Sequence, residues 1–433
     1  MTTRRQFLTV AGGVAGFVGA GGIAAAGVLA ANQRTDRRPE DAPGVPDPLL
    51  AATASGLVTV RGTDSRSAGT AAYPAVVYPA AVCTPDARTI YTAVPAGDGA
   101  TNLEGIDLAT GRVKHGLALA GQWVPRVASV RGTVALTAAG GPTTPSRPAG
   151  RERTTIVIVD SGGERRRLDL PGNYEPDAFR SDDSGLFVLD WLPPGAPDRY
   201  RVRVVELASD SLGPLLTRLK APVPEGAEEE MRGEGRQAVY SPDGLTLYTL
   251  YTHQPDHQHT RDLLAGGRPT EVHAFVHTLS LDVGWAYCLD LPDPFGHGPA
   301  AGHTLTLSAD GKRLYVADLT SGRLAVADTE ALTVQRVVPV PTGSGNACAA
   351  VSPDGRRLFL GGDSGIHVVD PVALTVTAGW DAGGAVRGLA VSRDGARLYV
   401  GHPGAVGWHE PVTGAEQGRR PVEGLTDLRR TLP

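Results

Sequence analysis

Short runs of alternating hydrophobic and polar residues recur along the chain, each followed by turn-forming residues. In the clearest copies an apolar strand ends at Ser, a Pro, Asp and Gly reverse the chain, and a second alternating strand follows. Pro supplies a fixed φ and Gly tolerates a positive one, so the pattern predicts an all-β fold of short antiparallel strands. The copies are YSPDGLTLYTL (240–250), LSADGKRLYVA (307–317), VSPDGRRLFLG (351–361) and VSRDGARLYVG (391–401), with weaker ones at 83–93, 129–138 and 180–190.

Most copies continue into a third strand, which ends in Asp or Glu before a turn, and then into a fourth strand. Four antiparallel strands recurring at roughly 40–55 residues are typical of the blades of a β-propeller. Through its Ser-Pro-Asp-Gly-x-x-Leu-Tyr-Val pattern, the chain resembles the YVTN/WD40-like β-propeller superfamily from about Leu49 to its end. The resemblance implies four-stranded antiparallel blades. It implies little about activity, because this fold hosts many unrelated functions.

The number of blades follows from the units and from the two ends. The C-terminal VEGLTDLRR (422–430) matches an innermost strand that lacks its own blade, and LLAATASGLVTVRGTDS (49–65) matches later strands that lack an innermost one. Pairing them would close the ring as an eighth, composite blade without an exposed edge. Alternatively, these strands complete or extend another blade, so the sequence predicts seven or eight blades. Seven complete units begin near residues 79, 121, 173, 236, 299, 345 and 384.

Residues 1–31 carry the pattern of an export signal. Arg4 and Arg5 precede Phe7 and Leu8, and no charged residue follows until Arg34. The stretch resembles a twin-arginine signal, which implies an extracytoplasmic protein, secreted or held in the cell envelope. We prefer cleavage of this segment. An uncleaved N-terminal anchor is the alternative, and it is the one membrane association that we expect.

Composition separates the remaining chain into two parts. Residues 32–48 are polar, charged and rich in Pro, which predicts a disordered linker, and residues 49–433 are expected to form a single propeller domain. The formal net charge of −5 argues against nucleic acid as a partner. We expect Cys83, Cys288 and Cys348 to be buried free thiols, with one disulfide as the alternative in an exported protein.

Loop lengths indicate which face of the propeller binds. We name the strands of a blade A to D from the channel outward, so that B–C loops and the D–A links between blades share one face. The Asp residues of the Ser-Pro-Asp-Gly turns, on the opposite face, are interpreted as turn formers. Three successive units carry long B–C loops, and loops longer than the fold requires are often functional. These loops span residues 140–153, 193–199 and 253–270.

Polar side chains are predicted to converge at the channel. Five positions before the Ser of the turn, or the residue aligned with it, strand A carries a charged residue or histidine in four units. A ring of polar groups at a concave opening is a default binding site. The alternative is that they are solvated residues at the start of each strand. Neither His303 nor Arg387 is expected to support the core. The four residues are Glu175, Arg236, His303 and Arg387.

Histidines concentrate in and after the third long loop. We interpret this loop as a polar or partner-facing segment, and we predict no cofactor. A divalent metal held by a loop histidine together with His297 or His303 is the alternative. The acidic segment 224–236 is expected to be a solvated connection between blades, with calcium binding as the alternative. The loop histidines are His253, His257 and His259.

These observations favour a binding or interaction module over an enzyme. No Gly-x-Ser-x-Gly nucleophile elbow follows the signal, and the chain offers no second domain for a hydrolase. The expected ligand is a small molecule, a glycan or an envelope protein, bound on the face of the B–C loops and D–A links. A lactonase-like hydrolase with its active site at the channel opening and a cell-envelope scaffold are the alternatives.

Overall fold

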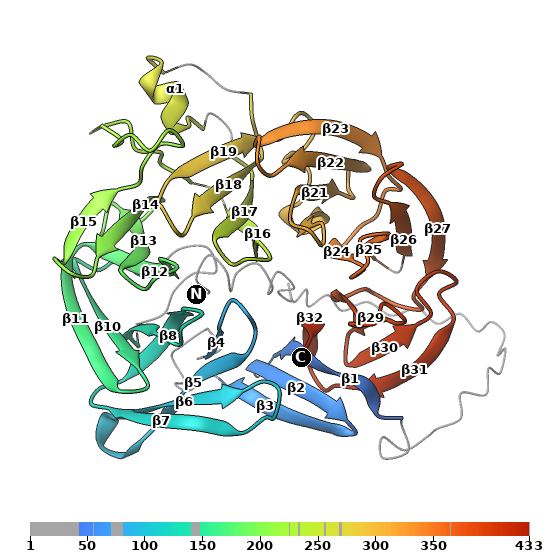
Figure 1. Ribbon diagram of the computed structural model, residues 1–433, viewed down its shortest axis with the longest axis horizontal. Helices are drawn as coiled ribbons and strands as arrows, with labels where there is room; N and C mark the ends of the chain where they lie inside the picture. Colours follow the sequence, from blue (N-terminus) through green and yellow to red (C-terminus); the bar gives the residue numbers. More distant parts are fainter. Residues whose placement is uncertain are drawn as a thin grey trace, which may run out of the picture.

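The computed structural model folds into eight four-stranded antiparallel sheets arranged as a ring, counted over the part of the chain that it describes (Figure 1). The all-β propeller prediction is therefore confirmed, and the blade number is eight. In seven of the sheets, the first strand in sequence lies nearest the centre of the ring and the next three follow outward. The structure describes residues 43–54, 56–70, 81–139, 148–224, 226–232, 234–254, 257–267, 271–363 and 365–432.

Seven blades are continuous in sequence, and we number them in chain order. Blade 1 comprises β4 (Ala81–Cys83), β5 (Thr89–Pro95), β6 (Thr101–Asp107) and β7 (Val113–Leu119). Blade 2 comprises β8 (Trp123–Ala128), β9 (Val134–Ala138), β10 (Arg153–Asp160) and β11 (Gly163–Pro171). Blade 3 comprises β12 (Asn173–Phe179), β13 (Gly185–Leu192), β14 (Arg199–Glu206) and β15 (Ser211–Pro214). Blade 4 comprises β16 (Glu234–Tyr240), β17 (Thr246–Thr252), β18 (Phe275–Ser280) and β19 (Ala286–Asp290).

The later blades follow the same plan. Blade 5 comprises β20 (His303–Leu307), β21 (Arg313–Asp318), β22 (Arg323–Asp328) and β23 (Thr333–Pro339). Blade 6 comprises β24 (Cys348–Val351), β25 (Leu358–Gly362), β26 (Gly365–Asp370) and β27 (Thr375–Asp381). Blade 7 comprises β28 (Leu389–Val391), β29 (Leu398–His402), β30 (Ala405–His409) and β31 (Glu416–Pro421). Short helical segments lie between strands: η3 (Gly97–Gly99), α1 (Thr260–Leu264) and η4 (Ala300–Gly302).

Blade 8 joins the two ends of the described chain. Its innermost strand is β32 (Leu425–Thr431), followed outward by β1 (Val45–Thr53), β2 (Gly56–Gly62) and β3 (Asp64–Thr70). In Figure 1 the red β32 lies beside the blue β1, and the two strands pair antiparallel with Ala51 opposite Leu428. The predicted composite blade is thus present, and it pairs the edge that each terminal segment would otherwise expose.

The core lies between the blades rather than inside any one of them. Successive side chains of a strand point to opposite faces of its sheet. In β1, Leu49 and Ala51 therefore enter the cluster shared with blade 7, whereas Leu50 and Ala52 enter the cluster shared with blade 1. Both faces of a blade are buried, which explains why many strands are almost continuously apolar.

The repeated turn is built by side-chain hydrogen bonds, as its sequence predicted. In blade 5 the Ser308 hydroxyl donates to Asp310 Oδ1 at 2.6 Å, and the Arg313 backbone N–H donates to Ser308 Oγ at 2.9 Å. The bond from Ser308, followed by one from the Lys312 backbone N–H, lowers the pKa of the Asp310 carboxyl. The same Ser-to-Asp bond recurs in blades 4, 6 and 7, which confirms these carboxylates as turn formers.

The propeller begins earlier than predicted. β1 starts at Val45 instead of Leu49, because Val45 is buried and Asp47 is bonded to Tyr399 of blade 7. Most of the predicted linker and the whole export signal, with Arg4, Arg5, Phe7 and Leu8, lie outside the described residues. Within the described ranges, no helix combines the length and apolar character needed to cross a membrane. All three cysteines are free thiols, as expected, but only Cys288 is fully buried, whereas Cys83 and Cys348 are partly buried.

Candidate functional site

The three long B–C loops lie on neighbouring blades, and two of them contact each other. The described part of the blade 2 loop reaches the blade 3 loop, where the Arg151 backbone N–H donates to the Pro194 carbonyl at 3.0 Å. Asn173 Nδ2 then bonds the carbonyls of Ala149 and Pro194 at 3.0 and 3.1 Å. Asn173 is fully buried and starts β12, so these loops are fixed to the scaffold.

The blade 4 loop contacts a D–A link, as the topology predicted. His257 Nε2 lies 2.8 Å from Glu229 Oε1, which belongs to the link between β15 and β16. His259 precedes α1, and its backbone N–H donates to Asp262 Oδ2 at 3.0 Å, a bond that fixes the start of the helix. B–C loops and D–A links therefore share one face of the ring.

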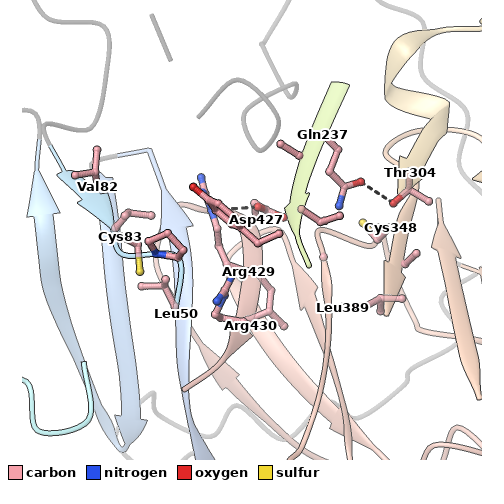
Figure 2. A pocket seen from close by; sticks show the side chains of 18 of the residues that line it. Leu50, Val82, Cys83, Gln237, Thr304, Cys348, Leu389, Asp427, Arg429 and Arg430 are labelled. Carbon is pink, nitrogen blue, oxygen red and sulfur yellow. Dashed lines mark hydrogen bonds and ion pairs between the residues drawn. The ribbon is translucent and has the colours of Figure 1, made fainter. Parts of the chain in front are cut away.

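A cavity of about 610 Å³ occupies the centre of the ring. Residues from the innermost strands of seven blades line it, all except blade 3. Figure 2 shows Gln237 and Thr304 bonded to each other across two blades, with Asp427 and Arg429 nearby on β32. Ligand-binding cavities in proteins commonly measure ~300–1,000 Å³, so this channel has the size for a small molecule.

Arginines dominate the charge of the channel. Among the residues that the structure describes, five guanidinium groups line the cavity, against two carboxylates, those of Asp86 and Asp427. The lining therefore carries a formal excess of three positive charges, although the whole chain carries a net negative charge. An electropositive cavity inside an acidic protein favours an anionic ligand. The five arginines are Arg126, Arg236, Arg387, Arg429 and Arg430.

Two of these arginines are almost fully withdrawn from solvent. Arg126 is 6% exposed and donates from Nε to Thr137 Oγ1 at 2.7 Å. Arg236 is 9% exposed and donates from Nη2 to the carbonyls of Ala347 and Ala301 at 3.3 and 3.4 Å. Burial lowers the pKa of both guanidiniums, an effect that the charge of Glu175 opposes at Arg126. Both groups stay protonated, so two positive charges lie where they have little contact with water.

The carboxylate on β32 is weakly ionised. Asp427 Oδ2 lies 3.4 Å from Arg429 Nε. Burial raises the pKa of Asp427 to about 7, although the charges of Arg429 and Arg236 oppose the shift. Near neutral pH this carboxyl is therefore only partly ionised, which leaves the arginines less neutralised than the formal count implies.

The channel thiols are poor nucleophiles. Cys83 and Cys348 both line the cavity. Burial raises the pKa of Cys83 to about 11 and that of Cys348 to about 12. Neither is a thiolate at neutral pH, so neither offers the reactive form of a catalytic cysteine.

The structure divides the four residues predicted to converge at the channel. Arg236 and Arg387 line the same cavity. Glu175 is buried in β12, the innermost strand that contributes no lining residue, and acts on the channel through its charge on Arg126. His303 is also outside the set of lining residues. Arg236 and Arg387 are therefore placed to contact a ligand in the cavity, whereas Glu175 and His303 are not among its lining residues.

His303 supports the link between blades 4 and 5, whereas we expected it to have no role in supporting the core. Its side chain is fully buried, its Nε2 accepts from the Gly296 backbone N–H at 3.0 Å, and its Nδ1 lies 3.1 Å from the Pro299 carbonyl. Burial lowers its pKa, and these bonds fit a neutral ring protonated on Nδ1. The expectation was wrong because sequence offset gives the position along a strand but does not reveal the adjoining link.

The structure brings two of the predicted loop histidines together with partners that the sequence did not suggest. His257 and His259 are buried beside Glu229 and Cys288. His253 is exposed and contacts Thr252, whereas His297 pairs with Asp293 at 2.9 Å. Among the described residues, neither His297 nor His303 belongs to the group of converging metal-ligating atoms.

Three glutamates of the acidic segment 224–236, Glu228 to Glu230, are half-buried and paired, whereas Pro224, Gly226 and Arg232 of the same segment are exposed. Glu228 lies 2.7 Å from Arg203, and Glu230 lies 2.7 Å from Arg199, both on β14. Glu229 points toward the histidines. The position of Glu229 in the D–A link before blade 4 could have predicted this contact, because that link shares a face with the histidine loop. Nothing in the sequence marked Cys288, which lies on the outermost strand.

No protein-family model matches the chain, and no curated protein matches it. Among solved structures, the chain is similar to apo AztD from Citrobacter koseri, with 12% identity over 89% of this chain and 97% of that one, at a TM-score of 0.53. A second Citrobacter koseri AztD structure gives 13% identity, the same coverage and a TM-score of 0.52. The dihydro-heme d1 dehydrogenase NirN in complex with DHE gives 12% identity over 93% and 77%, at 0.47. The AztD likenesses support the propeller fold alone.

Proposed function

We propose that this chain is an exported propeller of the YVTN/WD40-like type that binds a small anionic ligand in its central channel. The observation that carries the proposal is the excess of five guanidiniums over two carboxylates around a cavity of about 610 Å³. Export is supported by the Thr-Arg-Arg-Gln-Phe-Leu sequence near the N-terminus. The ligand class is a carboxylate, sulfate or phosphate compound, because guanidinium groups bind such oxygens through paired hydrogen bonds.

Burial supplies the driving force for binding an anion. A charged group withdrawn from water is costly unless an opposite charge compensates it. Arg126 and Arg236 are both nearly buried. The charge of Glu175 acts on Arg126, whereas that of Asp427 acts on Arg236, and Asp427 is only partly ionised because burial raises its pKa to about 7. An anion in the cavity would add negative charge beside the five lining guanidiniums, at a place where low polarity strengthens the interaction.

The same geometry favours a binding module over the lactonase-like hydrolase. That alternative needs a glutamate and a histidine that reach the substrate together with the arginines. Glu175 and His303 lie outside the cavity lining, and His303 is engaged by Gly296 and Pro299. The arginines alone are sufficient for recognition, and they supply neither a nucleophile nor a general base.

Calorimetric titration of the purified full chain with sulfate, phosphate and citrate tests the proposal. We expect saturable binding of at least one of these anions at one site per chain. Arg387→Gln should weaken it by about 10–100-fold, as expected for loss of one charge-assisted hydrogen bond. Arg336→Gln is the matched control, because Arg336 is exposed on β23, the outermost strand of blade 5. Absence of binding, or equal weakening in both variants, would sink the proposal.

A further inference from the structure

A second site lies away from the channel, where three segments meet on blade 4. Glu229 comes from the link before β16, His259 from the loop between β17 and β18, and Cys288 from β19. One ligating atom from each of these residues lies within 4.8 Å of the other two. The segments are distant in sequence, with 59 positions between Glu229 and Cys288.

We propose that Glu229, His259 and Cys288 bind a single transition-metal ion, for which Zn²⁺ is the best fit. The set offers one carboxylate oxygen, one imidazole nitrogen and one sulfur. Zinc accepts all three donor types, whereas magnesium and calcium prefer oxygen alone. Three protein ligands leave a fourth tetrahedral position open, which is the arrangement of zinc sites that bind water or an exchangeable ligand.

The distances suit a metal after a small adjustment. Glu229 Oε1 lies 2.9 Å from Cys288 Sγ and 3.3 Å from His259 Nδ1. Zinc–ligand bonds of about 2.0–2.3 Å place neighbouring ligand atoms of a tetrahedron roughly 3.3–3.8 Å apart. The Glu229–His259 distance already fits, and Glu229 and Cys288 need to separate by only a fraction of an ångström to admit the ion.

The groups behind the ligands are those that orient metal ligands in proteins. The second ring nitrogen of His259, Nε2, lies 2.7 Å from Asp290 Oδ1. Arg261 holds that carboxylate by an ion pair and donates to the Cys288 carbonyl at 2.6 Å. A ligating histidine whose other nitrogen faces a carboxylate is a recurrent feature of zinc sites, because it fixes ring orientation.

His257 is a positioning residue in this arrangement. Its Nε2 lies 2.8 Å from the same Glu229 oxygen that faces His259 and Cys288. Its ring stacks on Phe275 with centroids 4.7 Å apart, and Phe275 also meets the edge of His259 at 4.9 Å. The cluster therefore has the Phe275 ring on one side, and three groups, those of His257, His259 and Cys288, face a single carboxylate oxygen.

Metal analysis of the purified, untagged full chain tests the inference. After incubation with Zn²⁺ and desalting, we expect about one zinc per chain by elemental analysis. Cys288→Ser and His259→Gln should each reduce it to background, and His257→Gln should weaken zinc binding by roughly 10–100-fold while keeping the stoichiometry at saturation. Cys348→Ser and His273→Gln are matched controls outside the site, and both should retain zinc.

Cobalt substitution of the unmodified chain keeps the test decisive if a variant fails to fold. Co²⁺ bound here should show a thiolate-to-cobalt absorption band in the near ultraviolet, which requires a cysteine ligand. A chain that binds neither ion, a cobalt complex without that band, or zinc that survives Cys288→Ser would overturn the inference. Arg387→Gln should leave the zinc content unchanged, so the inferred zinc site and the proposed anion site are tested independently.

Discussion

The Tyr399 hydroxyl donates a hydrogen bond of 2.6 Å to the Asp47 carboxylate, and the Asp47 backbone N–H donates back to the same hydroxyl at 3.0 Å. The two residues are 352 positions apart, and they join β29 of blade 7 to β1 of blade 8. This pair, together with the ladder between β1 and β32, closes the ring. Closure therefore rests on both ends of the described chain.

Removing the last strand should open the ring. Deletion of residues 422–433 takes Leu425 and Leu428 out of the core between blades 7 and 8 and leaves the inner edge of β1 unpaired. Loss of one buried Leu side chain typically costs ~2–5 kcal/mol, so we expect a fall in Tm of at least ~5 °C and aggregation at the exposed edge. Scanning calorimetry and light scattering measure both.

A milder change probes the same junction. Tyr399→Phe keeps the ring of this buried side chain but removes both bonds to Asp47, which should cost about 1–2 kcal/mol in the free energy of unfolding. Urea denaturation gives this value. An unchanged Tm in the deletion variant would mean that β32 is dispensable for closure.

The carboxyl of Asp427 should make stability depend on pH. Burial raises its pKa to about 7 in the folded protein, whereas an unfolded Asp titrates near ~3.9. The folded state therefore holds a proton that the unfolded chain has lost. The stabilisation is complete below about pH 4 and disappears as the pH rises through about 7. Between pH 5 and pH 8 the wild type should lose on the order of 1–3 kcal/mol relative to Asp427→Asn.

Urea denaturation of both proteins across this range gives the difference directly, because other titrating groups are common to the two. The same carboxyl should tune the proposed anion site. Sulfate, which keeps its charge over this range, should bind more tightly as the pH falls through about 7, and Asp427→Asn should flatten that dependence. A parallel pH profile in wild type and variant would contradict both expectations.

His303 and Arg387 each lie five positions before the Ser of their turn but should respond differently to substitution. His303→Ala removes a fully buried ring that bonds Gly296 and Pro299, so we expect a loss of about 1–3 kcal/mol in the free energy of unfolding. Arg387 is partly exposed in the channel, and Arg387→Gln should change stability by less than ~0.5 kcal/mol. Chemical denaturation separates the two, and equal effects would mean that both residues are structural.

Export provides a prediction that depends on the sequence alone. Replacing Arg4 and Arg5 by Lys should retain the protein in the cytoplasm with its fold intact, because the pathway reads the arginine pair. Cell fractionation followed by immunoblotting shows where the protein accumulates. Normal export of the double variant would argue against a twin-arginine signal.

The sequence by itself determined the architecture of the chain. Apolar alternation and the Ser-Pro-Asp-Gly turns are local, and each acts within about ten residues, as the Ser308–Asp310 bond illustrates. The match of 422–430 to an innermost strand also suggested the composite blade as one of two outcomes, and the pairing of β1 with β32 decides for it. The shared face of B–C loops and D–A links followed from strand alternation in the same way.

Only the tertiary structure decided which side chains meet. Cys288 carries no local signal, yet its sulfur faces Glu229, and Arg261 of α1 donates to its carbonyl, so the contact depends on two segments outside the strand. The sequence placed His303 correctly along its strand. The link that buries it comes from residues 291–302, and the repeat pattern does not predict the path of that link. Periodicity fixes where a strand runs and which face it buries. Convergence of side chains depends on irregular loops packing against one another, and that packing is set by contacts between residues far apart in the chain.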